Sequence, residues 1–301
     1  MQNKIAISVD VEDWYHSSAI FGKNIPQFEQ NVKSLTKKHK NIDYVSKPTL
    51  NLLKIFDYFD IKATFFIVSH LGDTNPNLIK QIHDSGHEIA CHSMYHSEAI
   101  DFRGEPLISK ETFLRSTKKS KKTLESICEK EVVGYRAPGA FISGWMIDIL
   151  EELGFKYDSS VSINSIYNKT DIRPKRVSTV PYYPKKGSLE VQQSHREIIE
   201  FPWSYWNFYG FKFPTGGGPF LRYFRHQYII NGLIDSLHRG HTMFYLHPLD
   251  IATKFPGIKN RKLFWYGRGK NTLTSLLKII GFFQNRKVFT THRDILNKLN
   301  I

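Results

Sequence analysis

The chain has 301 residues, enough for one large α/β domain or two small ones. Hydrophobic residues make up 41% of it and charged residues 23%, a globular composition that excludes a fibrous or disordered protein. The net charge of +14 favours an anionic partner, yet zinc-finger spacing, a phosphate-binding glycine loop and an RNA-recognition signature are all missing, so we expect no nucleic-acid binding.

Short β-branched or aromatic runs alternate with helical patterns along the chain. We expect strands at 4–10, 63–68, 88–91, 132–135, 155–158, 198–203, 242–246 and 288–291. We expect helices at 49–59, 76–85, 109–129, 143–153, 223–238 and 273–283. This alternation predicts an α/β fold: a parallel sheet closed or nearly closed into a barrel of about seven units. We treat residues 1–301 as a single domain, with an insertion at about 17–47 and a C-terminal extension at about 250–301.

Polar side chains follow the predicted strands. Asp10, His92, Arg136, Asp158 and His247 each come at or just after a strand end. In α/β barrels the catalytic residues come from the C-terminal ends of several strands. We therefore expect these side chains to form one site.

The first strand ends in three acids, Asp10, Glu12 and Asp13. Residues two apart on a strand share a face, so Asp10 and Glu12 point together and Asp13 points away. One carboxylate would bind a metal while the other acts as a base. The alternative is a polar strand end with Glu12 and Asp13 in solvent.

His92 and His96 are four residues apart, a spacing that places both on one face of a helical turn. Two histidines and one carboxylate are the ligand set of an open-sided catalytic metal site. The alternative is two ordinary surface or core histidines. Cys91 is either a soft metal ligand or a small buried residue.

His247 and Asp250 form a further candidate pair at a strand end. A histidine is suited to general-acid work, and Asp250 could orient it, whereas the alternative is a loop histidine before Pro248. Arg136 either holds the base carboxylate in a bidentate pair or makes a structural ion pair. Both interpretations of Arg136 predict the same contact.

Glycines and aromatic residues between 201 and 219 suggest a substrate cleft. The run Gly216-Gly217-Gly218-Pro219 needs unusual backbone angles or close approach of another segment, as in a cleft loop or a tight turn. Trp203 is either part of a sugar-stacking wall or a core residue. The residues we expect at the substrate are Pro138, Trp203, Gly217, Gly218 and Asp250.

The start of the chain shows no charged-then-apolar export segment before Ile5, and no apolar run reaches about 18 residues. We therefore expect a cytoplasmic protein. Peripheral membrane contact through Leu273–Phe283, which mixes Leu, Ile and Phe with lysine, is an alternative to core packing of that helix.

Five motifs in this order resemble those of the polysaccharide deacetylases, the family with the NodB homology domain, also called carbohydrate esterase family 4. They are Ser-Val-Asp-Val-Glu-Asp at 8–13, His-Ser-Met-Tyr-His at 92–96, Gly-Tyr-Arg-Ala-Pro-Gly at 134–139, Tyr-Asp-Ser-Ser at 157–160 and Leu-His-Pro-Leu-Asp at 246–250. The resemblance covers nearly the whole chain. It is closest to the branch with a Gly-Gly-Gly loop and a C-terminal Tyr-Gly-Arg-Gly-Lys segment.

This resemblance implies a distorted (β/α)7-type barrel and a divalent metal, commonly zinc. By matching positions, Asp10 would be the general base, His92 and His96 metal ligands, and Arg136 and His247 the orienting residue and the general acid. The third ligand would be Glu12 or Asp13. Many relatives have two adjacent aspartates in the first motif, whereas here Val11 separates Asp10 from Glu12.

The implied function is removal of an N-acetyl group from an amino sugar in a glycan or glycan precursor. The positive charge favours a substrate that carries phosphate, such as a nucleotide- or lipid-linked sugar. Two alternatives are an amidohydrolase that cleaves another non-peptide C–N bond on the same fold and a non-catalytic glycan- or membrane-binding protein.

Overall fold

The computed structural model describes residues 2–16, 30, 34, 43–101, 104–166, 177–192, 195–253 and 269–299. The predicted insertion at 17–47 lies largely outside these residues, and so does the 254–268 part of the predicted C-terminal extension.

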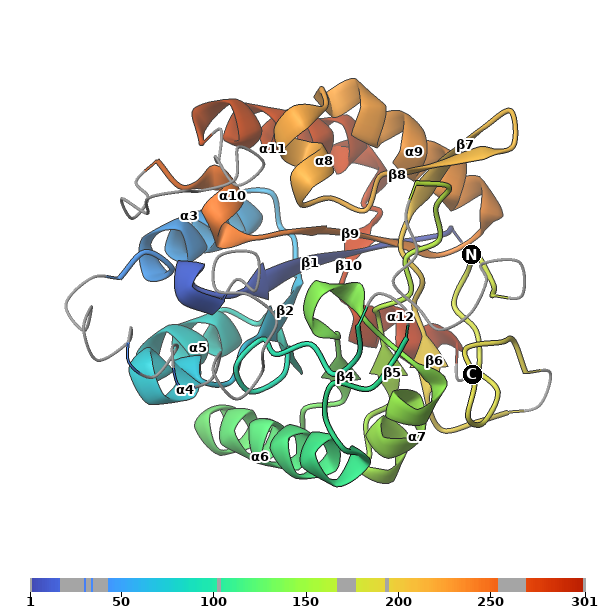
Figure 1. The fold of residues 1–301 in the computed structure, drawn as a ribbon. Coiled ribbons are helices and arrows are strands. Elements are labelled where there is room, and N and C mark those ends of the chain that lie inside the picture. The colour runs from blue at the N-terminus through green and yellow to red at the C-terminus, as the bar shows by residue number, and fades with distance from the viewer. Residues whose placement is uncertain are drawn as a thin grey trace.

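The core of the fold is an eight-stranded parallel sheet, curled and surrounded by helices (Figure 1). Its strands are β1 (Ile5–Val11), β2 (Thr64–Ile67), β3 (Glu88–Cys91), β4 (Gly134–Tyr135), β5 (Tyr157–Asp158), β6 (Ile199–Glu200), β9 (Thr242–Leu246) and β10 (Phe289–Thr290). They follow the order β10-β1-β2-β3-β4-β5-β6, and β9 also pairs with β1. All eight predicted strands are present, which confirms the α/β barrel.

Helices cover the outer face of the sheet (Figure 1). The longer ones are α3 (Ser46–Tyr58), α5 (Pro76–Asp84), α6 (Lys110–Cys128), α7 (Gly144–Glu152), α9 (His226–Arg239), α11 (Lys270–Phe283) and α12 (His292–Leu299). Three shorter ones are α4 (Leu71–Thr74), α8 (Pro219–Tyr223) and α10 (Pro248–Ile251). The helix predicted at 223–238 is interrupted, because Phe224 and Arg225 are extended between α8 and α9.

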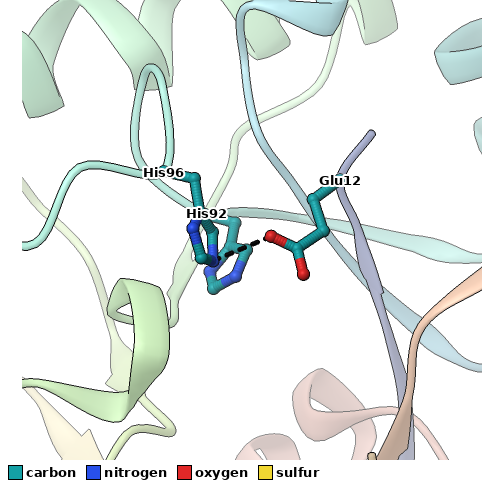
Figure 2. A group of neighbouring side chains, drawn as sticks. All are labelled: Glu12, His92 and His96. Atoms are coloured by element: carbon teal, nitrogen blue, oxygen red, sulfur yellow. Dashed lines mark ion pairs between the residues drawn. The ribbon is translucent and has the colours of Figure 1, made fainter. Parts of the chain in front are cut away.

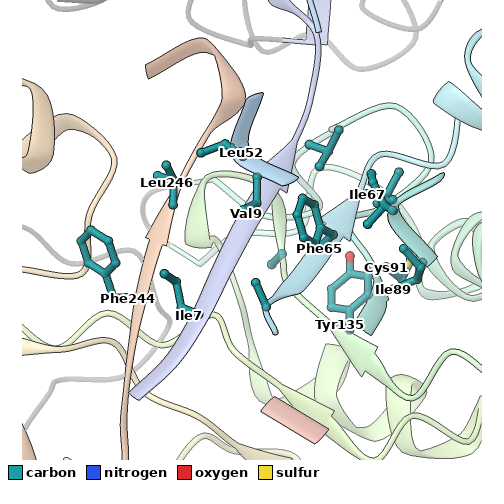
Figure 3. Packing of buried hydrophobic residues seen from close by; sticks show 14 of the residues in the cluster. Ile7, Val9, Leu52, Phe65, Ile67, Ile89, Cys91, Tyr135, Phe244 and Leu246 are labelled. Carbon is teal, nitrogen blue, oxygen red and sulfur yellow. The ribbon is translucent and has the colours of Figure 1, made fainter. Parts of the chain in front are cut away.

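Strand alternation in β1 separates two kinds of core. Ile5, Ile7 and Val9 pack outward against the helices, in the cluster that also holds Leu52 and Phe65 (Figure 3). Ala6 packs inside the barrel, in a second cluster. Asp10 is an even number of residues from Ala6, so the same period of two aims it at the barrel interior.

Helix α12 closes the N-terminal end of the barrel. Its Ile295 and Leu296 belong to the interior cluster. Beside them Glu88 accepts hydrogen bonds from Thr64 Oγ1 at 2.7 Å, the Arg293 N–H at 3.0 Å and Tyr157 Oη at 2.9 Å. The candidate functional site lies at the opposite end of the barrel, at the C-terminal ends of the strands.

The sequence prediction missed the antiparallel hairpin β7 (Tyr205–Phe208) and β8 (Phe211–Pro214), which projects from the edge of the molecule (Figure 1). Its turn residues Tyr209 and Gly210 have φ of 49° and 85°, as in the two-residue hairpin turns that match strand twist. Within the described ranges, no helix is both long and apolar enough to cross a membrane.

Candidate metal and catalytic site

Glu12, His92 and His96 converge just beyond the ends of β1 and β3 (Figure 2). One potential ligand atom from each of the three buried side chains lies within 4.8 Å of the others. Asp13, the other candidate for the third ligand, is not in this group: its Oδ1 accepts the Trp14 N–H at 2.7 Å, and burial raises its pKa to about 7. The structure therefore gathers Glu12 with the histidines.

The predicted helical turn through His92 and His96 is wrong. The segment after β3 is irregular, and Ser93 and His96 have φ of 63° and 64°, outside the helical region. Ser93 Oγ accepts the His96 N–H at 2.9 Å and so stabilises a tight turn in place of the helix. The two imidazoles still meet, with ring centroids 4.9 Å apart.

The three side chains fit a divalent metal. His92 Nδ1 donates to the Arg136 carbonyl oxygen at 2.8 Å, which leaves Nε2 as its ligand atom, and burial lowers the pKa of the ring to about 4. Glu12 Oε2 is buried and lies 2.9 Å from His96 Nε2, but the two atoms are not aligned for a hydrogen bond. Burial opposes ionisation of Glu12, but the neighbouring His96, His247 and His92 together outweigh it and lower the Glu12 pKa. Burial opposes protonation of His96, but Glu12 and Glu98 outweigh it and raise the His96 pKa. Metals bind an ionised carboxylate and a neutral imidazole, so metal binding here would release the His96 proton.

Asp10 forms a buried ion pair with Arg136. Nη1 of Arg136 donates to Asp10 Oδ1 at 2.6 Å and to Ser8 Oγ at 3.0 Å. Nε and Nη2 donate to the carbonyl oxygen and hydroxyl of Ser159, at 2.9 and 3.0 Å. These bonds fix the guanidinium. Arg136 holds Asp10 through a single Nη1 contact to Oδ1, so the bidentate pair considered from the sequence is wrong.

Aromatic rings surround the Arg136 guanidinium. Its Cζ lies 4.0 Å from the ring centroid of Phe66, 5.5 Å from Tyr245 and 5.7 Å from Trp203. Trp203 is buried and donates Nε1–H to the Ser159 carbonyl at 2.9 Å. Trp203 therefore supports Arg136 from the core and presents no open stacking wall. Cys91 is also a core residue, with its Sγ 3.1 Å from Ser120 Oγ.

His247 reaches the same site from the end of β9. Its Nε2 lies 3.3 Å from Glu12 Oε1, while Nδ1 and the backbone N–H donate to Asp250 Oδ2 at 3.2 and 2.7 Å. Burial opposes protonation of His247, but Asp250 and Glu12 outweigh it and raise its pKa to about 9. Asp250, expected at the substrate, thus orients His247 and favours its protonated, proton-donating form.

Arg222 of α8 extends this series of contacts and was missed by the sequence analysis. The guanidinium of this buried side chain donates through Nη1 to Asp250 Oδ1. Burial opposes ionisation of Asp250, but Arg222 and His247 outweigh it and lower the Asp250 pKa to about 2. The only signal in the sequence was an arginine shortly after the glycine loop, which does not reveal a partner 28 residues away.

We expect Arg222→Met to destabilise the protein by about 3–5 kcal/mol, because it leaves Asp250 buried without its strongest counter-charge. Urea unfolding measures this. The double variant Arg222→Met/Asp250→Leu removes both charges and should recover most of that stability. A single variant as stable as the wild type would contradict the assigned pairing.

Asp158 and Glu200 form a buried pair of carboxyl groups behind Arg136. Glu200 Oε1 accepts the N–H groups of Ser160 and Val161 at 3.2 and 2.9 Å, and Ser160 Oγ donates to Asp158 Oδ1 at 2.8 Å. The same hydroxyl accepts the Ala137 N–H at 2.8 Å. Burial and the charge of Asp158 raise the pKa of Glu200 well above its usual value, so the pair shares a proton. This network fixes the Arg136–Ala137 backbone.

We expect Glu200→Gln to keep the fold and Glu200→Leu to lose about 1–3 kcal/mol for each N–H left unpaired. The amide of glutamine can donate to Asp158 and still accept from Ser160 and Val161. The raised pKa of Glu200 in the folded state stabilises the protein at low pH, and this stability is lost as the pH rises through that pKa. Glutamine does not titrate, so Glu200→Gln should flatten the loss of stability toward alkaline pH. Urea unfolding across pH 5–9, in roughly unit steps, compares the three proteins. Equal damage from both substitutions would refute the shared-proton network.

The remaining predicted substrate residues line the same end of the barrel or support it. Pro138 is buried and begins the short helical turn Pro138–Ala140 after Arg136. Gly217 and Gly218 pack against β9: a Cβ on Gly217 would lie 1.6 Å from the Tyr245 carbonyl oxygen, and one on Gly218 2.6 Å from Tyr245 Oη. Close packing against Tyr245 of β9 therefore explains why both positions are glycine. A substrate role for Pro138, Gly217 and Gly218 remains a prediction.

Two family models match the chain in succession. Residues 41–157 match "Polysaccharide deacetylase", and residues 166–296 match "Domain of unknown function (DUF3473)". Both regions contribute to the one parallel sheet, the first with β2 to β5 and the second with β6, β9 and β10. His247, Asp250 and Arg222 lie within the second match.

Curated relatives match about a third to a half of the chain. The chain is 29% identical over 156 residues to a peptidoglycan deacetylase of Helicobacter pylori, which covers 49% of this chain and 47% of the relative. It is 38% identical over 116 residues to the peptidoglycan deacetylase-like protein FGM2 of Gibberella zeae, which covers 37% of this chain and 32% of the relative. The chain thus spans about a third to a half of these two proteins.

Solved structures share the fold over almost the whole chain. A candidate polysaccharide deacetylase from Mycobacterium smegmatis has a TM-score of 0.63 at 19% identity and covers 98% of this chain and 89% of its own. The allantoinase Puue has a TM-score of 0.58 at 13% identity over 97% of this chain and 88% of its own. The fold is thus shared with an allantoinase as well, whereas the motifs and the family model over residues 41–157 point to the polysaccharide deacetylases. Residues 41–157 thus carry a region of the polysaccharide deacetylase family, and residues 166–296 carry a DUF3473 region.

Proposed function

We propose that this protein is a metal-dependent N-deacetylase that hydrolyses the acetamide of an amino sugar to acetate and a free amine. The observation that carries the proposal is the convergence of three groups at one end of the barrel. They are the Glu12–His92–His96 cluster, the Asp10–Arg136 pair and the His247–Asp250 pair.

Glu12, His92 and His96 would hold the metal, and zinc suits this set of one carboxylate and two imidazoles. A bound divalent ion supplies Lewis-acid polarisation of the acetamide carbonyl and lowers the pKa of water. His92 is held in the ligating orientation by its bond to the Arg136 carbonyl.

Asp10 and His247 would move the protons. Asp10, fixed by Arg136, takes a proton from the attacking water, whose oxygen forms the new C–O bond. His247 gives its Nε2 proton to the departing nitrogen as the C–N bond breaks. Four backbone N–H groups beside the site donate hydrogen bonds within the fold and so help to fix the shape of the site. They belong to Arg136, Ala137, Ala140 and Phe141.

We further propose a substrate that carries phosphate, such as a nucleotide- or lipid-linked N-acetyl sugar, because the net charge of +14 attracts anions. The test incubates the protein with N-acetylated nucleotide sugars, lipid-linked sugars and neutral chito-oligosaccharides, with Asp10→Asn as the control, and measures acetate. Release from phosphate-bearing sugars that weakens with salt supports both proposals. Release only from neutral oligosaccharides, unaffected by salt, would refute the substrate class, and no acetate from any N-acetyl sugar would refute N-deacetylation.

A further inference from the structure

A continuous series of aromatic rings joins α8, the start of α9 and the β7–β8 hairpin. Neighbouring ring centroids lie 4.5 to 6.4 Å apart. We call this series the aromatic ladder; its members are Phe220, Phe224, Tyr228, Trp206, Phe213, Phe211, Phe208 and Tyr209. The proposed catalytic residues are not members of this ladder.

The hairpin part of the ladder is an aromatic sheet face that is half-buried at Trp206 and Phe213 and exposed toward its tip. Trp206 pairs with Phe213 and Phe208 with Phe211, so all four rings share one face of the hairpin. Tyr209 is 96% exposed, Phe208 48% and Phe211 42%. Large aromatic side chains gathered at a projecting tip mark an interaction surface, whereas single exposed apolar residues need no explanation.

The arrangement of the rings favours an apolar medium over a glycan chain. Phe224 stacks between Phe220 and Tyr228, at interplanar angles of 26° and 21°. A sugar ring packs on the open face of an aromatic side chain, and these faces already cover one another. Of the exposed rings, Phe208, Phe211 and Phe224 carry no hydroxyl for a sugar, and Tyr209 carries the one phenol.

The charge around the ladder is positive. Residues 201–234 contain no Asp or Glu, and the first acid after them, Asp235, is paired with Arg239. Exposed Arg225 follows Phe224, and Lys278 of α11 lies near enough to act with Arg225 on the pKa of His226. Aromatic side chains flanked by cations are typical of surfaces that bind anionic lipid.

We propose that the aromatic ladder is an interfacial anchor that inserts the tip of the β7–β8 hairpin into an anionic lipid bilayer, with Arg225 and Lys278 against the headgroups. The ladder begins on α8, whose Arg222 contacts Asp250, so the anchor is built onto the element that supports His247. The anchor differs from the helix Leu273–Phe283 considered from the sequence, because Leu276, Ile279, Ile280 and Phe283 of α11 are buried in the core. The proposed anchor does not depend on the proposed N-deacetylation.

The test is co-sedimentation of the full chain with vesicles of phosphatidylcholine containing about one third phosphatidylglycerol, and with pure phosphatidylcholine vesicles. The hairpin variant Phe208→Ser/Tyr209→Ser/Phe211→Ser changes only exposed side chains. We expect it to weaken binding to anionic vesicles by about tenfold or more. Arg225→Gln/Lys278→Gln should weaken binding by about fivefold for each charge removed. Tyr58→Ser is the matched control, since Tyr58 is 80% exposed on α3 away from the ladder.

Three results would overturn the anchor. One is equal sedimentation of the wild type and the hairpin variant when circular dichroism shows both folded. A second is a dimer in analytical ultracentrifugation that the hairpin variant alone abolishes without any vesicle binding, which would assign the face to a second copy. The third is retardation by immobilised chito-oligosaccharide, lost in the hairpin variant, again without vesicle binding. Activity on a soluble substrate should be the same in wild type and hairpin variant, which separates this test from that of the catalytic proposal.

Discussion

Asp10→Asn is expected to lower kcat by about 10²–10⁴-fold, the range for loss of a general base. Asparagine has nearly the shape of aspartate, and its Oδ1 can still accept from Arg136 Nη1, but it cannot take a proton from water. Arg136 also keeps its bonds to Ser8 and Ser159 and the nearby charge of Asp158. Steady-state acetate release measures kcat, and a thermal melt checks that the variant is folded.

Asp13→Asn is the matched control for this substitution. It makes the same chemical change three residues away, at a carboxyl group that binds the Trp14 N–H and lies outside the Glu12–His92–His96 cluster. We expect it to keep kcat within about fivefold of wild type, since an isosteric change at a residue that is not the proposed base leaves the proton transfer intact. If Asp10→Asn were as active as Asp13→Asn, Asp10 would not be the base.

His92→Ala is expected to lower metal affinity by at least about 100-fold, because even a lost second-shell partner costs 10- to 100-fold. The imidazole is buried and is held in the ligating orientation by the Arg136 carbonyl, so its loss removes a pre-oriented ligand. Activity should fall in proportion. Metal content after equilibrium dialysis measures the affinity.

His83→Ala controls for loss of a histidine as such. His83 is partly exposed on α5, beside Asp84 and far from the strand ends that carry the cluster. It should leave metal content at about one ion per chain. Wild-type metal content in His92→Ala would show that the ion binds elsewhere and would contradict the assigned site.

The sequence predicted the strand ends and the residues on them because those signals are local. Apolar strand runs followed directly by Asp10, His92, Arg136 and His247 place these side chains at one end of a parallel barrel. Strand alternation also favoured Glu12 over Asp13, and the structure gathers Glu12 with the two histidines.

What the sequence did not reveal depends on contacts between distant segments. Arg222 meets Asp250, and Glu200 meets Asp158, only after the barrel closes. The His92–His96 spacing suggested a helical turn, but Ser93 Oγ competes for the His96 N–H and gives a left-handed backbone instead. The β7–β8 hairpin was missed because its aromatic residues resemble core, although Tyr209-Gly210 was a hairpin-turn signal.

The most direct test of the proposed chemistry is a metal titration of acetate release. Protein freed of metal by chelation should be inactive on an N-acetylated sugar, and zinc should restore activity in proportion up to about one ion per chain. Acetate and free amine should then appear in equal amounts, and Glu12→Gln should need far more zinc. Undiminished acetate release by the metal-free protein, or restoration that is the same in Glu12→Gln as in the wild type, would contradict the proposal that Glu12, His92 and His96 form the catalytic metal site.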